Sequence, residues 1–511
     1  MKKRIYLLTL YVMLNMILVG CQFNSNTNDT DGFESNLDSL PLTILTVNDL
    51  HGYIVQEDNG TDGLSNMAYL IEDIRNENDL NDVILIGNGD MFQGTSISNM
   101  SQGRAVLEAM NEMDFDAMGI GNHEFDWGIE TILNYFDGND ENGEANFPLL
   151  NANIYEKDSN NLLDVDNGKV MESVVVEREG IKVGIISYVG DVYNSIAYDK
   201  VSDYEFRLNI EESVKEIAGN LKTNGTDVII VNIHGGYMSG IDKYFYNRDL
   251  AQLKDSTGDY LVDAVINGHT HSRQTGEITR KDGVAMPVIQ AGDNGEFLGK
   301  ITLNIDMETK EIDHQTVELL DVSDVNTSHD KDVEAIIDRF IEELGNESLV
   351  KSGETIRYRN QLEEWVANVM LAATGADIAI HNDGGIRSTG DIRSGEDVTL
   401  NQMYEIMPFD NNIYIIQTTY GQIKSILGDD YYFYAIRNGF NKSDSTPCTV
   451  AIISYVYFKD DLASVRNDND KDSGLFIRDL LVEDLKIKGQ NDENFAPSSN
   501  SEASIGLKYG N

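Results

Sequence analysis

The sequence predicts an α/β fold divided into two domains, and three observations support this prediction. Its 511 residues exceed what one hydrophobic core usually serves. A hydrophobic fraction of 41% is ordinary for a globular protein. From Leu42 onward, short β-branched runs alternate with amphipathic helical stretches, a pattern typical of layered α/β structures.

The first residues have the pattern of an export signal. A basic start, an apolar stretch over residues 5–19 and Gly20 precede Cys21. We expect residues 1–20 to be a signal peptide and the Asn-, Asp- and Ser-rich segment 21–41 to be a flexible tether. Cys21 resembles the lipobox cysteine of bacterial lipoproteins, which implies acylation at this residue. An ordinary signal peptide or a short membrane anchor is the alternative.

Lipidation of Cys21 would place the protein on the outer face of the cell membrane, or on the periplasmic side if an outer membrane exists. The only other cysteine is Cys448, so no intramolecular disulfide would remain, and we expect Cys448 to be a small buried residue. The net charge of −49 argues against binding to nucleic-acid polymers. An anionic substrate would therefore need a local positive centre, such as metal ions and a few arginines.

The first domain is expected over residues 42–315. Its expected strands lie at 42–47, 83–86, 117–120, 183–187, 228–233 and 264–266, and its expected helices at 65–75, 104–113 and 211–221. Residues 286–290 and 300–305 are expected to be hairpin strands that end this domain. Ligand sites in such folds gather in the loops beyond the carboxyl ends of the strands.

A second domain is expected over residues 351–489, after a polar linker with a helix at 316–350. It is predicted to contain a helix at 362–374 and strands near 378–380, 413–418 and 450–458. The Asn-, Ser- and Glu-rich segment 490–511 is predicted to be disordered.

Five polar clusters stand where apolar runs end: NDLHG at 48–52, GNGD at 87–90, GNHE at 121–124, NIHGG at 232–236 and GHTH at 268–271. An extended segment would point Asp49 and His51 to the same face, and the two oxygens of Asp90 could bridge two cations. Such ligands suit Zn²⁺, Mn²⁺ or related ions, and two of these about 3.5–4 Å apart hydrolyse phosphate esters. Any one cluster alone would more often be a helix cap or a surface feature.

In this order, DLHG, GNGD, GNHEFD, HGG and GHTH resemble the motifs of the calcineurin-like metallophosphoesterases. With its C-terminal half, the chain is similar to the bacterial 5′-nucleotidase/UDP-sugar hydrolase family. The resemblance implies an α/β/β/α metallophosphoesterase sandwich, a C-terminal α/β substrate-binding domain and two divalent metal ions (Zn, Mn, Co or similar). It also implies one metal held by Asp49, His51 and His271, a second held by Asn122, His234 and His269, and Asp90 as the bridging ligand.

The resemblance gives His123 a catalytic role, either in stabilising the pentacoordinate phosphoryl group or in aiding the leaving group. Asp126 follows three residues later, so its carboxylate can hold one ring nitrogen of His123 and favour the imidazolium. The alternative is that Asp126 caps the following helix.

The segment HNDGGIR at 381–387 resembles the family's substrate loop, which implies that Asn382 and Arg387 clasp the substrate. Arg359 stands one position off the family's register, so a solvated arginine is an equal alternative. Phe409 in MPFDNN resembles the aromatic residue on which a base stacks. Tyr455 aligns with the second aromatic residue, but FKDDLAS follows it where the family has a Gly-rich stretch. Core packing is the alternative for both rings.

These features predict an extracellular phosphoesterase with two metal ions that converts nucleoside 5′-monophosphates to nucleoside and phosphate by direct attack of a metal-bridged hydroxide, without a covalent phosphoenzyme. The departure after Tyr455 keeps 2′,3′-cyclic nucleotide phosphodiesterase/3′-nucleotidase and UDP-sugar hydrolase activities open. A hypothesis from another class is a surface lipoprotein that captures nucleotides or metal without turnover. A nucleotide is the expected small-molecule partner, the membrane is contacted through the lipid only, and no protein partner is implied.

Overall fold

A computed structural model describes residues 39–55, 63–77, 83–165, 168–192, 195–235, 246–325, 327–387, 391–409, 411–429, 431–459, 462–467 and 469–509. The predicted signal peptide and Cys21 lie outside the described residues. Residues 40–511 form one compact unit. No helix within the described ranges is long and apolar enough to cross a membrane.

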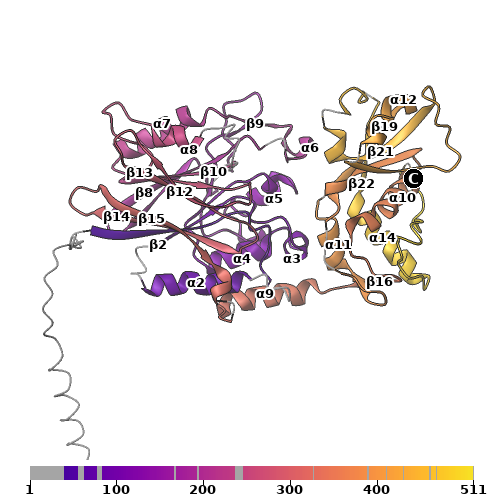
Figure 1. The fold of residues 1–511 in the computed structure, drawn as a ribbon, viewed down its shortest axis with the longest axis horizontal. Helices are drawn as coiled ribbons and strands as arrows, with labels where there is room; N and C mark the ends of the chain where they lie inside the picture. Colours follow the sequence, from indigo (N-terminus) through magenta and orange to yellow (C-terminus); the bar gives the residue numbers. More distant parts are fainter. Residues whose placement is uncertain are drawn as a thin grey trace, which may run out of the picture. The chain divides into compact units, whose positions relative to one another are not determined.

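The first sheet has seven strands in the order β15-β14-β1-β2-β3-β4-β6. Three of them, β2, β14 and β15, are labelled in Figure 1. They are β1 (Ser39–Val47), β2 (Val83–Asn88), β3 (Ala117–Gly119), β4 (Leu149–Leu150), β6 (Val170–Met171), β14 (Phe297–Asp306) and β15 (Ile312–Asp321). Strands β1 to β4 and β6 run parallel, whereas β14 and β15 form an antiparallel pair. The carboxyl ends of β1, β2 and β3 therefore meet at one edge of the sheet.

The second sheet has six strands in the order β12-β13-β11-β10-β8-β7. They are β7 (Ser173–Arg178), β8 (Ile181–Val189), β10 (Val228–His234), β11 (Ala264–Asn267), β12 (Arg273–Thr279) and β13 (Ala285–Ala291). The four central strands are parallel, and the edge strands β7 and β12 are antiparallel to their neighbours. A short pair, β5 (Ile154–Glu156) and β9 (Tyr204–Phe206), stands apart from both sheets.

The strands carry apolar side chains on both faces of each sheet. One face of each sheet packs against the other sheet, and the opposite face packs under helices. Leu42 and Ile44 of β1 enter a buried layer shared with Ile185 and Ile230 of the second sheet. Leu45 and Val47 point the other way, into the core under the helices. Successive side chains of β1 thus alternate between the second sheet and the helices, which confirms the predicted α/β/β/α sandwich.

Helices cover both outer faces of the sandwich. They are α2 (Leu64–Glu77), α3 (Ser96–Met100), α4 (Arg104–Glu112), α5 (Ile129–Leu133), α6 (Tyr198–Val201), α7 (Ile210–Thr223), α8 (Tyr246–Ala251) and α9 (Lys331–Leu344). The helices α2, α4 and α9 share the core on the outer side of the first sheet, and α7 and α8 share the core of the second. The predicted helices at 65–75, 104–113 and 211–221 are thus confirmed.

The structure corrects two predictions about the end of this domain. The strands at 286–290 and 300–305 do not pair with each other, because β13 pairs with β12 in the second sheet and β14 pairs with β15 in the first. The helix expected within residues 316–350 is present as α9, but this segment packs on the first domain rather than only linking the two domains. Strand β15 continues to Asp321, and α9 packs on α2 and α4 and buries Val333, Ile337 and Phe340.

The C-terminal domain is built on a five-stranded sheet in the order β20-β17-β21-β19-β22. The strands of this sheet are β17 (Ile378–Asn382), β19 (Asn412–Thr419), β20 (Tyr432–Ile436), β21 (Pro447–Ile453) and β22 (Lys471–Phe476), and a separate two-stranded sheet pairs β16 (Ser348–Lys351) with β18 (Asp397–Thr399). The helices of this domain are α10 (Glu363–Thr374), α11 (Leu400–Ile406), α12 (Tyr420–Ile423), α13 (Ser454–Tyr457) and α14 (Ile477–Gln490). Cys448 is free and buried in β21, as predicted.

Two further corrections concern this domain. The strand predicted at 450–458 ends at Ile453, and α13 follows, so Tyr455 is helical. The segment predicted to be disordered is ordered over 491–509: Phe495 is buried against Trp365, with ring centroids 4.6 Å apart. The buried carboxylate of Asp484 also accepts hydrogen bonds from the backbone N–H groups of Ser504 and Ile505. The polar composition of this C-terminal segment gave no indication of these few anchoring contacts.

Candidate metal centre and substrate cavity

The predicted metal ligands lie together at the carboxyl ends of parallel strands of both sheets. Asp49 follows β1, Asp90 follows β2, Asn122 follows β3, and His234 ends β10. His51 continues the loop after β1, and His269 and His271 follow β11. Because both sheets present these ends on the same side, residues more than two hundred positions apart come within contact distance.

The backbone at this centre is not extended, contrary to the prediction for Asp49 and His51. Five of the seven predicted ligands have positive φ values between 49° and 78°: Asp49, His51, Asp90, His269 and His271. Non-glycine residues rarely adopt this left-handed conformation, and it clusters at functional sites. Tight turns, rather than strand alternation, therefore aim these side chains inward.

Two glycines of the motifs allow the loops to pass each other. A Cβ atom on Gly89, whose φ is 75°, would lie 2.6 Å from the backbone N of Gly121 and 2.7 Å from Nδ1 of His234. A Cβ atom on Gly121 would lie 2.3 Å from Oδ1 of Asp90. The glycines in GNGD and GNHE thus permit an approach that any side chain would block.

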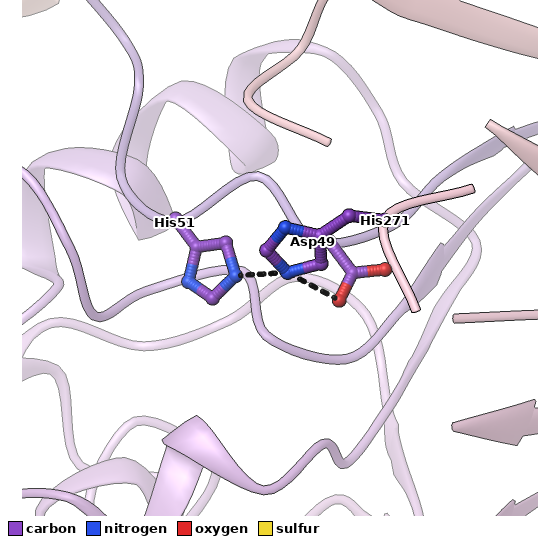
Figure 2. Close-up of side chains that lie close together, drawn as sticks. All are labelled: Asp49, His51 and His271. Carbon is purple, nitrogen blue, oxygen red and sulfur yellow. Dashed lines mark hydrogen bonds and ion pairs between the residues drawn. The ribbon is translucent and has the colours of Figure 1, made fainter. Parts of the chain in front are cut away.

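The first predicted ligand group consists of Asp49, His51 and His271 (Figure 2). Nε2 of His51 lies 3.1 Å from Nε2 of His271, which lies 3.6 Å from Oδ1 of Asp49. Nδ1 of His51 faces the backbone oxygen of Gln93 at 3.0 Å, and Nδ1 of His271 faces Oδ2 of Asp293 at 3.4 Å. Those acceptors hold the ring hydrogens on Nδ1, so the two Nε2 lone pairs point at one spot.

The second group consists of Asp90, His234 and His269, with Asn122 between them. Oδ1 of Asn122 lies 2.7 Å from Nδ1 of His269 and 3.3 Å from Nε2 of His234. The same Nε2 lies 3.0 Å from Oδ2 of Asp90. Nδ1 of His234 faces the backbone oxygen of Asn88 at 2.8 Å, which leaves Nε2 as the atom that faces the oxygens.

Charge and burial at this centre favour bound cations. Burial lowers the pKa of His51 to about 3, with His123 adding to the effect, and burial and His234 lower the pKa of His269 to about 4. Both imidazoles are therefore neutral and able to ligate. Burial also lowers the pKa of His234, but Asp90 and Asp49 outweigh it and raise the pKa to about 10. The two buried carboxylates, Asp49 and Asp90, are thus stabilised by positive charge at this centre.

The residues present fit divalent metal ions. Oδ2 of Asp90 is buried and receives no hydrogen bond from any described residue. Nε2 of His234 faces it at 3.0 Å, so either a protonated His234 or a cation bound between them balances the charge of this carboxylate. Imidazole, carboxylate and amide oxygen together suit Zn²⁺, Mn²⁺ or similar ions.

Sequence reasoning missed Glu124, which ties the two ligand loops together. Its wholly buried carboxylate accepts hydrogen bonds from the backbone N–H groups of Gly121 at 2.6 Å, Asp90 at 2.8 Å and Met91 at 2.9 Å. It therefore fixes Asp90 relative to Asn122. The GNHE motif contained the signal, since a charged residue between Asn122 and buried Phe125 needs partners.

His123 and Asp126 form the predicted dyad. Nδ1 of His123 lies 2.7 Å from Oδ2 of Asp126, while Asp126 makes no capping hydrogen bond to α5. Burial alone would lower the pKa of His123, but Asp126 and Asp90 raise it to about 9. The backbone N–H of His123 also donates to Oδ1 of Asp90 at 2.7 Å. The structure thus places an imidazolium beside the predicted bridging ligand.

A cavity of about 240 Å³ adjoins this dyad and includes residues of both domains. It is lined by His123, Asp126, Ser195, Ala197, Lys200, Asn382, Gly384, Gly385, Arg387, Phe409, Asn411, Tyr431 and Tyr455. The ring of Phe409 lies 6.2 Å from that of His123, and the guanidinium of Arg387 lies 5.2 Å from the ring of Phe409. The structure therefore brings four of the five predicted substrate residues to one cavity.

Arg359 is the exception. Its guanidinium pairs with the carboxylate of Asp383, and it is not among the lining residues. Gln93, which the sequence did not single out, joins the two domains. Its backbone oxygen faces His51, and its buried side-chain N–H donates to the backbone oxygen of Pro408 at 3.3 Å. It connects the metal-ligand loop with the loop that carries Phe409.

Comparison with known proteins agrees with this architecture. Residues 42–273 match the family model of the calcineurin-like phosphoesterases, and residues 347–462 match that of the 5′-nucleotidase C-terminal domain. Together the two matches give this chain the domain composition of the 5′-nucleotidases. The chain is therefore a metal-dependent phosphoesterase of the 5′-nucleotidase type that acts on nucleotides.

Individual members of the 5′-nucleotidase family match most of the chain. Snake venom 5′-nucleotidase of Gloydius brevicauda is 29% identical over 426 residues, covering 74% of this chain and 68% of that protein. The trifunctional nucleotide phosphoesterase protein YfkN of Bacillus subtilis is 29% identical over 423 residues, covering 76% of this chain and 27% of that longer protein. A 5′-nucleotidase precursor structure from Thermus thermophilus shares the fold, with a TM-score of 0.67 and 18% identity over 92% of this chain and 99% of that chain.

Proposed function

We propose that this protein is an extracellular enzyme that hydrolyses nucleoside 5′-monophosphates to nucleoside and phosphate with two bound divalent ions. One observation supports this most strongly. A single cavity is lined by the His123–Asp126 dyad from one domain and by Arg387, Phe409 and Tyr455 from the other. A substrate with a phosphate at one end and a flat apolar ring at the other would contact both.

In this proposal, Asp49, His51 and His271 hold one ion, and Asn122, His234 and His269 hold the other. Asp90 lies between the two groups and would bridge the ions. When bound, such a pair of ions supplies charge neutralisation for a phosphoryl group and acidifies water. Because Glu124 holds the backbone at Asp90, the bridging carboxylate would not have to reorganise on loading.

His123 would act on the phosphoryl oxygens from the side of the cavity. Asp126 keeps Nδ1 of His123 hydrogen-bonded. The other ring nitrogen, Nε2, can therefore donate a hydrogen bond or a proton to the ester oxygen of the leaving group. A protein that only binds nucleotide or metal, without turnover, would not need the charged His123–Asp126 pair. The dyad is therefore the feature that favours an enzyme over a surface protein that only binds nucleotide or metal.

The C-terminal domain would orient the nucleoside part. The guanidinium of Arg387 lies 5.2 Å from the ring of Phe409 in the cavity lining, which suits a planar cation directed at phosphate or ribose oxygens. Oδ1 of Asn382 is buried and receives no hydrogen bond from the described residues, so it can accept one from a ribose hydroxyl. Phe409 and Tyr455 would contact the base.

Lys200 supports a second substrate class. It lines the cavity from the first domain and adds a cation beyond Arg387. A nucleotide with a diphosphate bridge, such as UDP-glucose, carries the additional negative charge that this lysine would attract. We therefore propose UDP-sugar hydrolysis as the second candidate function. Hydrolysis of cyclic nucleotides and of 3′-nucleotides is tested in the same activity panel.

The test is an activity panel on purified protein with Mn²⁺, Zn²⁺ or Co²⁺, covering 5′-AMP, 5′-IMP, 3′-AMP, 2′,3′-cyclic AMP and UDP-glucose. We expect release of phosphate from the 5′-monophosphates. We also expect His123→Ala to lose turnover by a factor of about 10²–10⁴ while it keeps metal and nucleotide binding. Binding of nucleotide with no turnover of any substrate by the wild type would favour the capturing protein instead.

We also propose that the protein is exported and anchored through acylated Cys21. The supporting feature is the basic and apolar N-terminal sequence that ends at this cysteine. Metabolic labelling with a fatty acid should mark the wild type and not a Cys21→Ala variant. Equal labelling of both, or none of either, would refute the anchor and leave the proposed enzyme activity untouched.

A further inference from the structure

Arg478, in the first turn of α14, contacts the loop that carries Phe409. Its Nη1 donates hydrogen bonds to the backbone oxygens of Met407 at 2.9 Å and Pro408 at 3.2 Å. Met407 is the residue at which α11 ends, so the first bond satisfies a carbonyl group at a helix end, where intrahelical donors run out. The guanidinium carbon also lies 4.1 Å from the ring centroid of Tyr404, in the last turn of α11.

Two further hydrogen bonds hold the same loop. The backbone N–H of Ile477 donates to the backbone oxygen of Asn411 at 3.1 Å, which bonds the chain after Phe409 to the start of α14. The backbone oxygen of Pro408 also accepts from the side chain of Gln93 at 3.3 Å, so both of its lone pairs are used. The backbone on either side of Phe409 is therefore bonded to α14, and the ring lines the substrate cavity from this support.

Arg478 acts from outside the cavity. It is not among the lining residues, and its side chain is buried. Removal of its guanidinium would take the donor away from two backbone oxygens, and a buried carbonyl group without a donor is costly. The loop can relieve this cost by moving these carbonyl groups toward water, and Phe409 would move with them.

We propose that Arg478 is a positioning residue that holds Phe409 where its ring stacks on the base of a nucleotide. This inference rests on the proposed nucleotidase function and deepens it, because it names a residue outside the cavity on which recognition of the base depends. Stacking of a base on an aromatic side chain changes binding by about 5- to 150-fold, and a displaced ring would lose part of this.

The experiment measures kcat and KM for 5′-AMP on the full chain with Mn²⁺, together with the inhibition constant of ribose 5-phosphate, which has the sugar and the phosphate but no base. Arg478→Met keeps an apolar side chain and removes the donors. We expect it to raise KM for 5′-AMP about 5- to 20-fold. The kcat for 5′-AMP and the inhibition constant of ribose 5-phosphate should each change by less than about twofold, because neither depends on stacking.

A double-mutant cycle shows whether Arg478 acts through Phe409. In a Phe409→Ala background, Arg478→Met should raise KM for 5′-AMP by less than about twofold, because the ring that it positions is already absent. Arg478→Lys keeps a positive donor but loses the planar guanidinium, so its KM should lie between those of the wild type and Arg478→Met. The lysine variant also allows the same cycle if Arg478→Met does not fold.

Arg75→Met is the matched control. Arg75 is 8% exposed and Arg478 is 7% exposed, so the two side chains are equally buried. The guanidinium of Arg75 likewise donates to two backbone oxygens at a helix end, those of Met113 at 3.0 Å and Asp114 at 3.1 Å. Arg75→Met should therefore lower the melting temperature as Arg478→Met does, but it should leave KM for 5′-AMP unchanged.

The outcomes separate this inference from the proposed function. A wild-type KM for 5′-AMP in both Arg478 variants would overturn the positioning role while the nucleotidase stands. Equal increases in KM in the wild-type and Phe409→Ala backgrounds, or an equal increase in Arg75→Met, would overturn it as well. No hydrolysis of any nucleotide by the wild type would instead refute the proposed function, and this inference with it.

Discussion

Replacing Glu124 by glutamine should weaken both the fold and the metal centre. The change keeps the size of the side chain but turns one carboxylate oxygen into an NH₂ group. In the structure, Oε2 accepts from the N–H groups of Asp90 and Gly121, and Oε1 accepts from the N–H of Met91. The best orientation of glutamine keeps the first two bonds and sets its NH₂ against the N–H of Met91.

The expected magnitude follows from that lost bond. A buried hydrogen bond to a charged group contributes about 1.5–3 kcal/mol, and the backbone donor of Met91 is left unsatisfied. We therefore expect the free energy of unfolding to fall by about 2–3 kcal/mol. Displacement of Asp90 by even ~1 Å should lower kcat/KM for p-nitrophenyl phosphate by about 100-fold.

The assay combines denaturant unfolding, metal content and steady-state kinetics on Glu124→Gln and on the isosteric surface control Glu334→Gln. Glu334 is exposed on α9, so its variant should match the wild type in all three measurements. Wild-type stability together with wild-type kcat/KM in Glu124→Gln would refute the reasoning that this carboxylate positions Asp90.

Three other predictions follow from the contacts at the centre. Asp90→Asn should lower metal content as well as activity, and unchanged metal in elemental analysis would contradict the bridging role. Gln93→Leu should raise KM for nucleotides about three- to tenfold, because it removes the hydrogen bond to Pro408 that holds the loop of Phe409. The KM for p-nitrophenyl phosphate should change little. An equal change for both substrates would argue against a role of Gln93 in positioning that loop. Removal of metal by EDTA should lower the melting temperature, and re-added Mn²⁺ should restore it in a concentration-dependent way. A melting temperature insensitive to both would indicate that the folded chain binds no metal.

The alternation of strands and helices and the placing of polar residues at strand ends could be expected from local patterns, whereas the sandwich and the division of the ligands between two metals were implied by the resemblance to the family. Buried parallel strands such as β10 are continuous β-branched runs, and a polar residue at the end of such a run lies at the sheet edge where the others end. His123 and Asp126 were predictable for the same reason, since a spacing of three in a turn brings the two side chains together.

Other features depend on partners far away in the chain and could not be read from local pattern. Strands β13 and β14 follow one another, yet each pairs within a different sheet. Tyr455 follows a continuous apolar strand, and the turn into α13 has no proline or glycine to mark it. The C-terminal segment looks disordered by composition, but a few contacts, such as Phe495 on Trp365, order it.

The central claim is that two metal ions bind beside Asp90, and anomalous diffraction from crystals of Mn²⁺-loaded protein tests it most directly. The account predicts two peaks about 3.5–4 Å apart, one near Asp49, His51 and His271 and the other near Asn122, His234 and His269. A single peak, or peaks away from Asp90, would contradict it.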